Sequence, residues 1–168
     1  MRRWLDALYT AAGVLAAVFM VGVLICISLA IATRQMAIHI PGLDAYAGYC
    51  MAAAGFLALA HTFKKGEHIR VTLLLTSLPP KGRLRVDAFA LIVGTVIAAS
   101  LAWFSVKLVL DSHAFSDVST GEDATPLWIP QLSMAVGTVI FFIAMLDETI
   151  RRVRGHTDET AQETPLHE

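Results

Sequence analysis

The chain has 168 residues, of which 56% are hydrophobic and only 16% are charged, and its formal net charge is −1. Soluble domains average about 45–50% apolar and about 25% charged residues, so the apolar excess is large. It is gathered into four blocks rather than spread along the chain, which is typical of membrane-spanning helices. The pattern excludes an ordinary soluble enzyme and a disordered chain, and the small net charge does not favour bulk nucleic-acid binding.

Four membrane-spanning helices are predicted. No charged residue occurs from residue 7 to residue 33, which is long enough to cross the hydrocarbon core at about 1.5 Å per residue. We expect a retained signal-anchor helix here, because the stretch is long for a signal peptide and no clear cleavage site follows it. The four expected spans are 8–32, 43–63, 88–107 and 125–147.

The fourth span opens with two prolines. Pro126 suits the first turn of a helix that has Thr125 as its cap. Pro130 follows one turn later and would disturb the hydrogen-bond ladder. Since the stretch from Pro130 onward is short for a span, we expect a kinked first turn, with a helix start at Pro130 as the alternative.

The basic residues predict the orientation. The N-terminal segment, the loop at 64–87 and the segment after the fourth span carry 11 of the 13 Lys and Arg residues. Four spans place these three segments on one side, which the positive-inside rule makes the cytoplasmic side. We therefore expect a membrane domain at 1–154 with both termini in the cytoplasm, and a disordered cytoplasmic tail at 155–168.

The loop after the second span contains a short amphipathic segment. Its apolar residues follow the i, i+3, i+4, i+7 spacing of a helix: Val71, Leu74, Leu75 and Leu78. The segment is too short to span a membrane and ends at two prolines. We predict a helix at 67–78 that lies along the inner interface, where the flanking basic residues favour anionic phospholipid headgroups.

The middles of the spans lack the residues that chemistry in a membrane requires. Asp44 and His61 lie near the two ends of the second span, within reach of water. Cys26 and Cys50 lie inside apolar stretches, so we predict plain helix packing for both, and neither a disulfide nor a metal site. No span pairs a serine with a base at the same depth, and no two histidines suit a haem. We expect no catalytic residue, metal or cofactor on this chain.

Small residues recur at helical spacing in three of the spans. They are Ala45, Gly48, Ala52 and Gly55; Gly94, Ala98 and Ala102; and Ser133 and Gly137. Such ridges let helix backbones approach closely in lipid. Packing among the four helices and docking of one ridge on a different membrane protein both remain open.

Two segments resemble a known family. The run Gly66-Glu67-His68-Ile69-Arg70-Val71, followed by an apolar stretch and Leu78-Pro79, resembles the signature of the DctQ-like small permease subunit of tripartite ATP-independent periplasmic (TRAP) transporters. The run Thr125-Pro126-Leu127-Trp128-Ile129-Pro130, with Gly137 beyond it, resembles the start of that family's last helix. The chain length, the four spans and the inside termini also agree with this family.

The resemblance implies a non-catalytic subunit of a secondary, sodium-coupled transporter that imports an organic acid across the bacterial inner membrane. A large membrane subunit would hold the substrate and sodium sites, and a periplasmic substrate-binding protein would deliver the substrate. The small subunit would pair with the large one and brace it. The residues expected at the partner interface or in structural motifs are Gly66, Glu67, His68, Ile69, Val71, Leu74, Leu78, Thr125, Pro126, Pro130 and Gly137.

Two other classes of function stay open. A self-contained oligomeric channel or exporter would need polar residues along a pore, and the spans offer only Ser and Thr. A membrane anchor of a redox enzyme would need a haem. The acidic loop before the fourth span is either a solvated loop or a contact for the periplasmic protein; its residues are Asp111, Asp117, Glu122 and Asp123.

Overall fold

The computed structural model describes residues 2–38, 40–65, 80–121 and 123–153. These residues form four long helices and no strand: α1 (Arg2–Gln35), α2 (Leu43–Lys64), α4 (Pro80–Ala114) and α5 (Trp128–Val153). Each helix is long and apolar enough to cross a membrane. The predicted all-α membrane class with four transmembrane helices is therefore confirmed. The expected interfacial helix at 67–78 and the tail at 155–168 lie outside the described residues.

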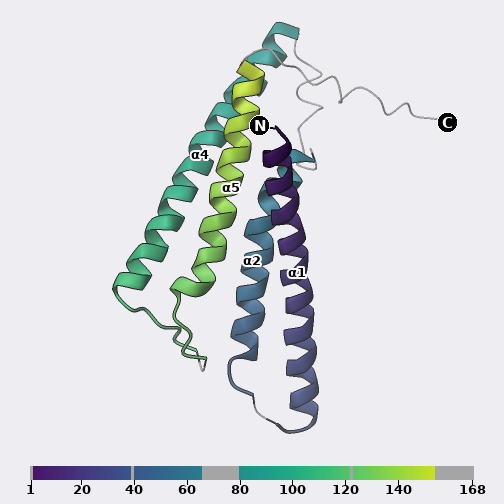
Figure 1. Ribbon diagram of the computed structural model, residues 1–168, viewed down its shortest axis with the longest axis vertical. Coiled ribbons are helices and arrows are strands. Elements are labelled where there is room, and N and C mark those ends of the chain that lie inside the picture. The colour runs from purple at the N-terminus through teal and green to yellow at the C-terminus, as the bar shows by residue number, and fades with distance from the viewer. Residues whose placement is uncertain (1, 39, 66–79, 122, 154–168) are drawn as a thin grey trace, which may run out of the picture.

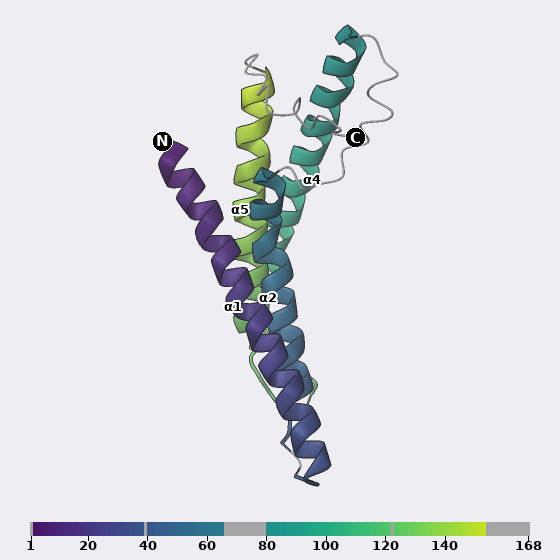
Figure 2. The same ribbon diagram turned by 90° about the vertical axis from the view of Figure 1, so that its right-hand side faces the viewer.

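The four helices form a layer rather than a closed bundle (Figure 1). α1 packs along α2, α2 packs on α5, and α5 packs on α4, whereas α1 touches α5 only slightly. In the described part of the chain, α4 contacts neither α1 nor α2. Figure 2 shows the layer from the side, with α1 and α2 toward the viewer. Helices α1 and α4 are thus the two edges, and most of the apolar surface points outward.

The two ends of the layer differ in what they contain. The start of α1, the end of α2, the start of α4 and the end of α5 share one end (Figure 1). We call it the basic end, because Lys64, Lys65, Arg151 and Arg152 lie there. The described residues of the segments 36–42 and 115–127 lie at the other end, which we call the loop end.

The fourth helix starts differently from the sequence-based expectation. α5 begins at Trp128, so Pro130 is its third residue. The first backbone N–H groups of a helix have no partner within it, so a proline in the first turn removes no hydrogen bond. Thr125 lies three residues before the helix, and the expected cap there is wrong, as is the alternative start at Pro130.

The core consists mainly of small residues. Nine of the thirteen buried hydrophobic residues in the described part are alanines. One cluster joins Tyr9 and Ala12 of α1 to Ala60 of α2 and Ala144 of α5. Small side chains let helix backbones approach closely, which is how helices associate where lipid is as apolar as the side chains. The layer is therefore held by close backbone packing, with few large side chains interlocked.

Candidate functional site

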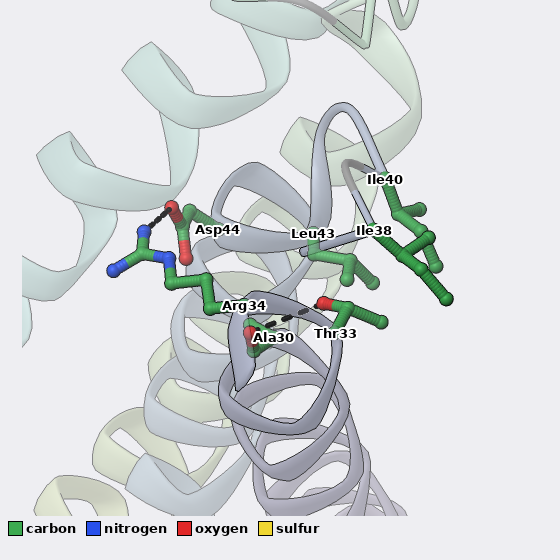
Figure 3. A pocket seen from close by; sticks show the side chains of 7 residues that line it. All are labelled: Ala30, Thr33, Arg34, Ile38, Ile40, Leu43 and Asp44. Atoms are coloured by element: carbon green, nitrogen blue, oxygen red, sulfur yellow. Dashed lines mark hydrogen bonds and ion pairs between the residues drawn. The ribbon is translucent and has the colours of Figure 1, made fainter. Parts of the chain in front are cut away.

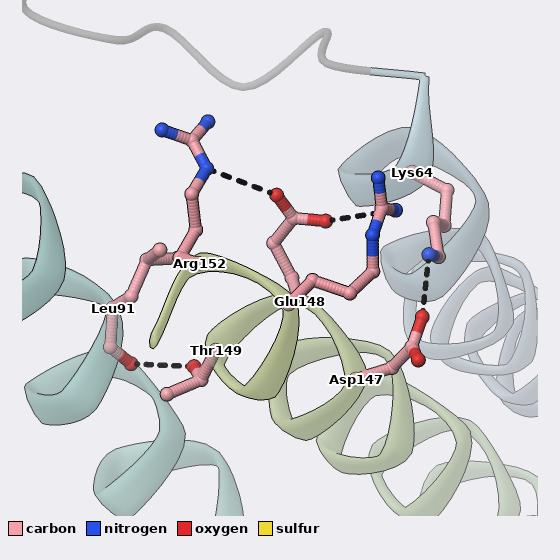
Figure 4. A network of polar contacts seen from close by, with 7 residues as sticks. Lys64, Leu91, Asp147, Glu148, Thr149 and Arg152 are labelled. Carbon is pink, nitrogen blue, oxygen red and sulfur yellow. Dashed lines mark hydrogen bonds and ion pairs between the residues drawn. The ribbon is translucent and has the colours of Figure 1, made fainter. Parts of the chain in front are cut away.

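A charged contact joins three helices at the basic end (Figure 4). The Lys64 Nζ lies 2.8 Å from the Asp147 Oδ2, and the two side chains are only 20% and 30% exposed. The same ammonium lies 5.4 Å from the centre of the Tyr9 ring. A charge left unpaired at such a half-buried position would be costly. The pair therefore fixes α2 against α5, and the tyrosine ring adds a cation–π contact from α1.

The next two residues of α5 extend this contact (Figure 4). Glu148 accepts hydrogen bonds from Arg151 and Arg152, each at 3.4 Å, and its side chain is 14% exposed. The hydroxyls of Thr149 and Thr95 lie 2.8 Å apart, which joins α5 to α4. Asp147, Glu148 and Thr149 of α5 thus contact α2, the last turn of α5 and α4, respectively. At this end of the layer, polar contacts hold the helices together in addition to the packing of small residues in the core.

Asp123 holds the loop end together. Tyr49 of α2 donates a hydrogen bond of 2.9 Å to its carboxylate, and Ser119 donates one of 2.8 Å. The hydrogen bond from Thr125, followed by those from Ser119 and Tyr49, lowers the pKa of Asp123 to about 2. Gly42 lies directly beneath with φ +83°, and a Cβ there would come within 2.7 Å of the Asp123 Cβ. The loop at 115–127 is therefore fastened to the start of α2.

Removing this carboxylate is expected to change how stability depends on pH. The folded-state pKa of about 2 lies below the ordinary value of 3.8, so Asp123 contributes stability above about pH 4 that is lost as the pH falls toward about 2. We expect the thermal midpoint of Asp123→Asn in detergent to fall less steeply over this range than that of the wild type. Asp117→Asn, at an exposed position, should follow the wild-type curve. Parallel curves for Asp123→Asn and the wild type would contradict the assignment.

The acidic loop residues thus divide into two kinds. Asp123 is occupied by contacts within the chain, whereas Asp111 and Asp117 are exposed. Glu122 lies outside the described residues. A contact with a periplasmic protein would therefore rest on Asp111 and Asp117 rather than on Asp123.

A small open pocket lies beside the turn from α1 to α2 (Figure 3). Its lining consists of Ala30, Thr33, Arg34, Ile38, Ile40, Leu43 and Asp44. Arg34 and Asp44 bind each other at 3.2 Å, with side chains 78% and 80% exposed. The Thr33 hydroxyl donates back to its own helix. Because the polar groups in the lining already have partners within the chain, the pocket does not indicate a catalytic centre.

Seven of the eleven residues expected at an interface or motif lie outside the described residues: Gly66, Glu67, His68, Ile69, Val71, Leu74 and Leu78. The other four are placed. The hydroxyls of Thr125 and Tyr46 lie 3.4 Å apart, and Pro126 pairs with Val118 in an isolated antiparallel β-bridge. The Pro130 carbonyl accepts a hydrogen bond from Ser133 at 2.7 Å. Pro126 thus lies in the turn before α5, and Pro130 lies in the first turn of α5.

At Gly137 the backbone of α2 lies very close to α5. A Cβ at this position would lie 2.5 Å from the carbonyl oxygen of Phe56 and 2.6 Å from its carbonyl carbon, far inside normal contact. The neighbouring Thr138 is fully buried and bonds back to its own helix. The ridge at Ser133 and Gly137 therefore serves packing within the chain.

The ridge on α4 also faces inward. Ala98 and Ala102 are 2% and 6% exposed, and a Cβ on Gly94 would meet the end of the Met145 side chain of α5. Since α5 is the helix against which α4 packs, this ridge forms the α4–α5 contact.

The ridge on α2 faces the opposite way. Gly48, Met51, Ala52 and Gly55 are all exposed, and no atom lies within 4 Å of a Cβ placed on either glycine. These four residues lie at helical spacing on one side of α2, and we call them the open strip. In the described part of the chain, the open strip is covered by none of the other three helices. It is the feature that an interface with another membrane protein would use.

The two described histidines, His61 and His113, contact residues of their own chain. The His61 ring packs against Gly13 of α1, whose Cβ would lie 2.7 Å from the ring. His113 stacks edge-on against Trp128, with 5.5 Å between ring centres. Among the described residues, no group of three or more His, Cys, Asp or Glu residues could hold a metal ion.

Sequence reasoning missed the pairing of Lys64 with Asp147. It used Lys64 and the basic residues after the fourth span for orientation, and it did not consider Asp147. The signal was present, because four alternating spans place the end of the second and the end of the fourth on the same side. Opposite charges at matched depth on two spans predict an ion pair once the helices are known to be neighbours.

The sequence matches a family model over residues 23–155, that of the DctQ component of tripartite ATP-independent periplasmic transporters. A comparison with curated proteins found no match. The matched range runs from the middle of α1 to just past the end of α5, so it covers most of the helical layer. The chain therefore belongs to the DctQ family of tripartite ATP-independent periplasmic transporter components.

Proposed function

We propose that this chain is the non-catalytic small subunit of a sodium-coupled transporter for an organic acid, and that it braces the large membrane subunit. Membership of the DctQ family supports a role in a TRAP transporter beside a large permease and a substrate-binding protein. The observation that carries the bracing role is the open strip of α2. The small residues of the open strip allow close contact with another helix, and no other described helix of the layer covers them.

The composition of the open strip supports a protein partner rather than lipid. A glycine within a helix lowers stability by about 0.5–1 kcal/mol relative to alanine. Gly48 and Gly55 do not offset this loss by close packing within the chain. A partner helix that rests on them gains close backbone contact. The edge helix α4 instead exposes large side chains such as Trp103 and Phe104, which suit contact with lipid.

The layer itself suits a stationary brace. The middles of its spans carry no Asp, Glu, Lys, Arg or His, and such residues mark ion and substrate pathways in membrane proteins. The sodium ions and the substrate would therefore bind to the large subunit. A broad apolar layer attached to one side of that subunit would widen its footprint in the bilayer and resist tilting while the transport domain moves.

The charges support one orientation in the bacterial inner membrane. The basic end would face the cytoplasm, with both termini on that side. The loop end would then face the periplasm, where the substrate-binding protein delivers its cargo. Among the described residues of the acidic loop, Asp111 and Asp117 are exposed, and this protein could meet them.

Uptake into vesicles tests the proposal. The large subunit is reconstituted with and without this chain, and sodium-driven uptake of a labelled organic acid is measured with the binding protein present. We expect uptake to fall at least about tenfold without the chain, equivalent to about 1.4 kcal/mol, and to recover when the chain is added back. Undiminished uptake without it would overturn the bracing role.

The chain alone in vesicles separates the other classes of function. We expect no ion or solute flux, and flux would favour the channel or exporter. A visible haem absorption in the purified chain would favour the redox anchor.

A further inference from the structure

The pocket beside the turn from α1 to α2 lies where both helices leave the apolar part of the membrane. Residues 7–33 carry no charge, and Arg34 is the next residue. Residues 45–63 contain no Asp, Glu, Lys or Arg, and Asp44 directly precedes them. Charged side chains at the ends of spans lie among the lipid headgroups, because the hydrocarbon core is costly for them. The pocket therefore opens at the level where headgroups meet acyl chains.

The size of the pocket suits one end of a larger molecule. Its volume is about 90 Å³, whereas a pocket that encloses a whole small-molecule ligand measures about 300–1,000 Å³. A molecule that places only its end here must keep its remainder outside the pocket. At this level of the membrane, a phospholipid meets that condition, because its acyl chains continue into the bilayer.

The lining has a charged side and an apolar side (Figure 3). Arg34 and Asp44 lie on one side, Ile38 and Ile40 lie on the other, and Leu43 lies between them. The two isoleucines are 50% and 41% exposed. A ligand that matches this lining carries both charges at one end and an apolar chain beside them.

The turn after α1 fixes the apolar side. The Ala37 N–H donates to the Arg34 carbonyl at 3.2 Å, and the Ile38 N–H donates to the Thr33 carbonyl at 2.9 Å. Ala37 has φ +54°, so these two bonds end α1 as a Schellman motif with a left-handed residue. The backbone thus holds Ile38 at the same end of α1 as the Arg34 side chain.

We propose that this pocket binds the headgroup of phosphatidylethanolamine. The Arg34 guanidinium binds the phosphate through two N–H groups, the Asp44 carboxylate accepts hydrogen bonds from the ammonium, and the isoleucines contact the start of an acyl chain. Arg34 and Asp44 lie 3.2 Å apart with side chains 78% and 80% exposed, and such an exposed pair is easily exchanged for other partners. The inference is independent of the proposed transport function.

The charges distinguish this lipid from the other common phospholipids. Phosphatidylglycerol has a phosphate but no cation, so it leaves the Asp44 carboxylate beside a second negative charge. The quaternary ammonium of phosphatidylcholine has no N–H group to donate to that carboxylate. Only a zwitterion with a primary ammonium satisfies both members of the pair.

Thermal unfolding of the full chain in a non-ionic detergent tests the proposal. The three phospholipids are titrated separately with identical short acyl chains, because a lipid that binds the folded chain raises its thermal midpoint. We expect half-saturation with phosphatidylethanolamine at a concentration at least about tenfold lower than with phosphatidylglycerol, with phosphatidylcholine between them. The proposal is overturned if phosphatidylglycerol matches phosphatidylethanolamine, if no lipid raises the midpoint, or if soluble phosphoethanolamine gives the same shift as the lipid.

Exchanging the two charges separates headgroup recognition from folding. Arg34→Asp with Asp44→Arg keeps an ion pair but exchanges its charges, whereas the phosphate and the ammonium keep their order along the lipid. We expect this variant to unfold near the wild-type temperature without lipid and to lose the preference for phosphatidylethanolamine. Ile40→Ser should weaken the binding of phosphatidylethanolamine and phosphatidylcholine alike. Lys65→Gln, at an exposed position of the basic end, should respond as the wild type does. A preference that survives the charge exchange would contradict the assignment.

Discussion

Replacing Gly137 by alanine is expected to destabilise the chain by about 1–3 kcal/mol. The added methyl carbon would lie 2.5 Å from the Phe56 carbonyl oxygen, and this oxygen belongs to the backbone of α2, which cannot rotate away. The two helices must separate, and the contact between α2 and α5 is the one that joins the two halves of the layer. Thermal or denaturant unfolding of the purified chain in detergent measures the loss.

The same substitution at Gly55 provides the control. No atom lies within 4 Å of a Cβ there, so alanine meets nothing and improves helix propensity by about 0.5–1 kcal/mol. We therefore expect Gly55→Ala to leave the isolated chain unchanged or more stable. If both variants lost the same stability, the difference between the inward and outward faces of α2 would be wrong.

The spans could be predicted from sequence because desolvating a charge in lipid is costly. Segments that cross a membrane therefore contain long stretches without charged residues. The order of the helices in space could not, since periodicity identifies a face without identifying what covers it. The ridge at Gly137 and the ridge at Gly48 and Gly55 have similar spacing, yet the first is buried and the second is open. Tertiary neighbours, which no local pattern encodes, made this difference.

The candidate site was predictable to a smaller extent. Gly137 was expected to matter, and the structure supplies the contact that makes a side chain there intolerable. From the sequence, Asp123 was grouped with the other acidic residues of the loop because all of them carry a carboxylate. Its hydrogen bond comes from Tyr49, 74 positions earlier in the chain. Such long-range hydrogen bonds follow from the fold and leave no trace in sequence spacing.

Enlarging the open strip is expected to separate the chain from its large subunit. Leucine side chains at Gly48 and Gly55 would stand where a partner helix needs close backbone contact, and no atom of the chain lies within 4 Å of their Cβ positions. We expect the double variant to retain less than about a tenth of the copurified large subunit, equivalent to about 1.4 kcal/mol or more. Sodium-driven uptake in vesicles should fall in parallel, because the brace no longer docks.

Two measurements decide whether this loss is due to docking. The isolated double variant must unfold at the wild-type temperature or above it, since the Cβ positions are open and leucine suits a helix better than glycine does. Ala17→Leu adds similar bulk to an exposed position on α1, away from the open strip, and is expected to copurify with the large subunit as the wild type does. Normal copurification of the Gly48→Leu, Gly55→Leu variant would place the interface elsewhere on the layer. If Ala17→Leu lost as much of the copurified large subunit, any added bulk on the outer surface would suffice to prevent docking. The open strip of α2 would then no longer explain the pairing.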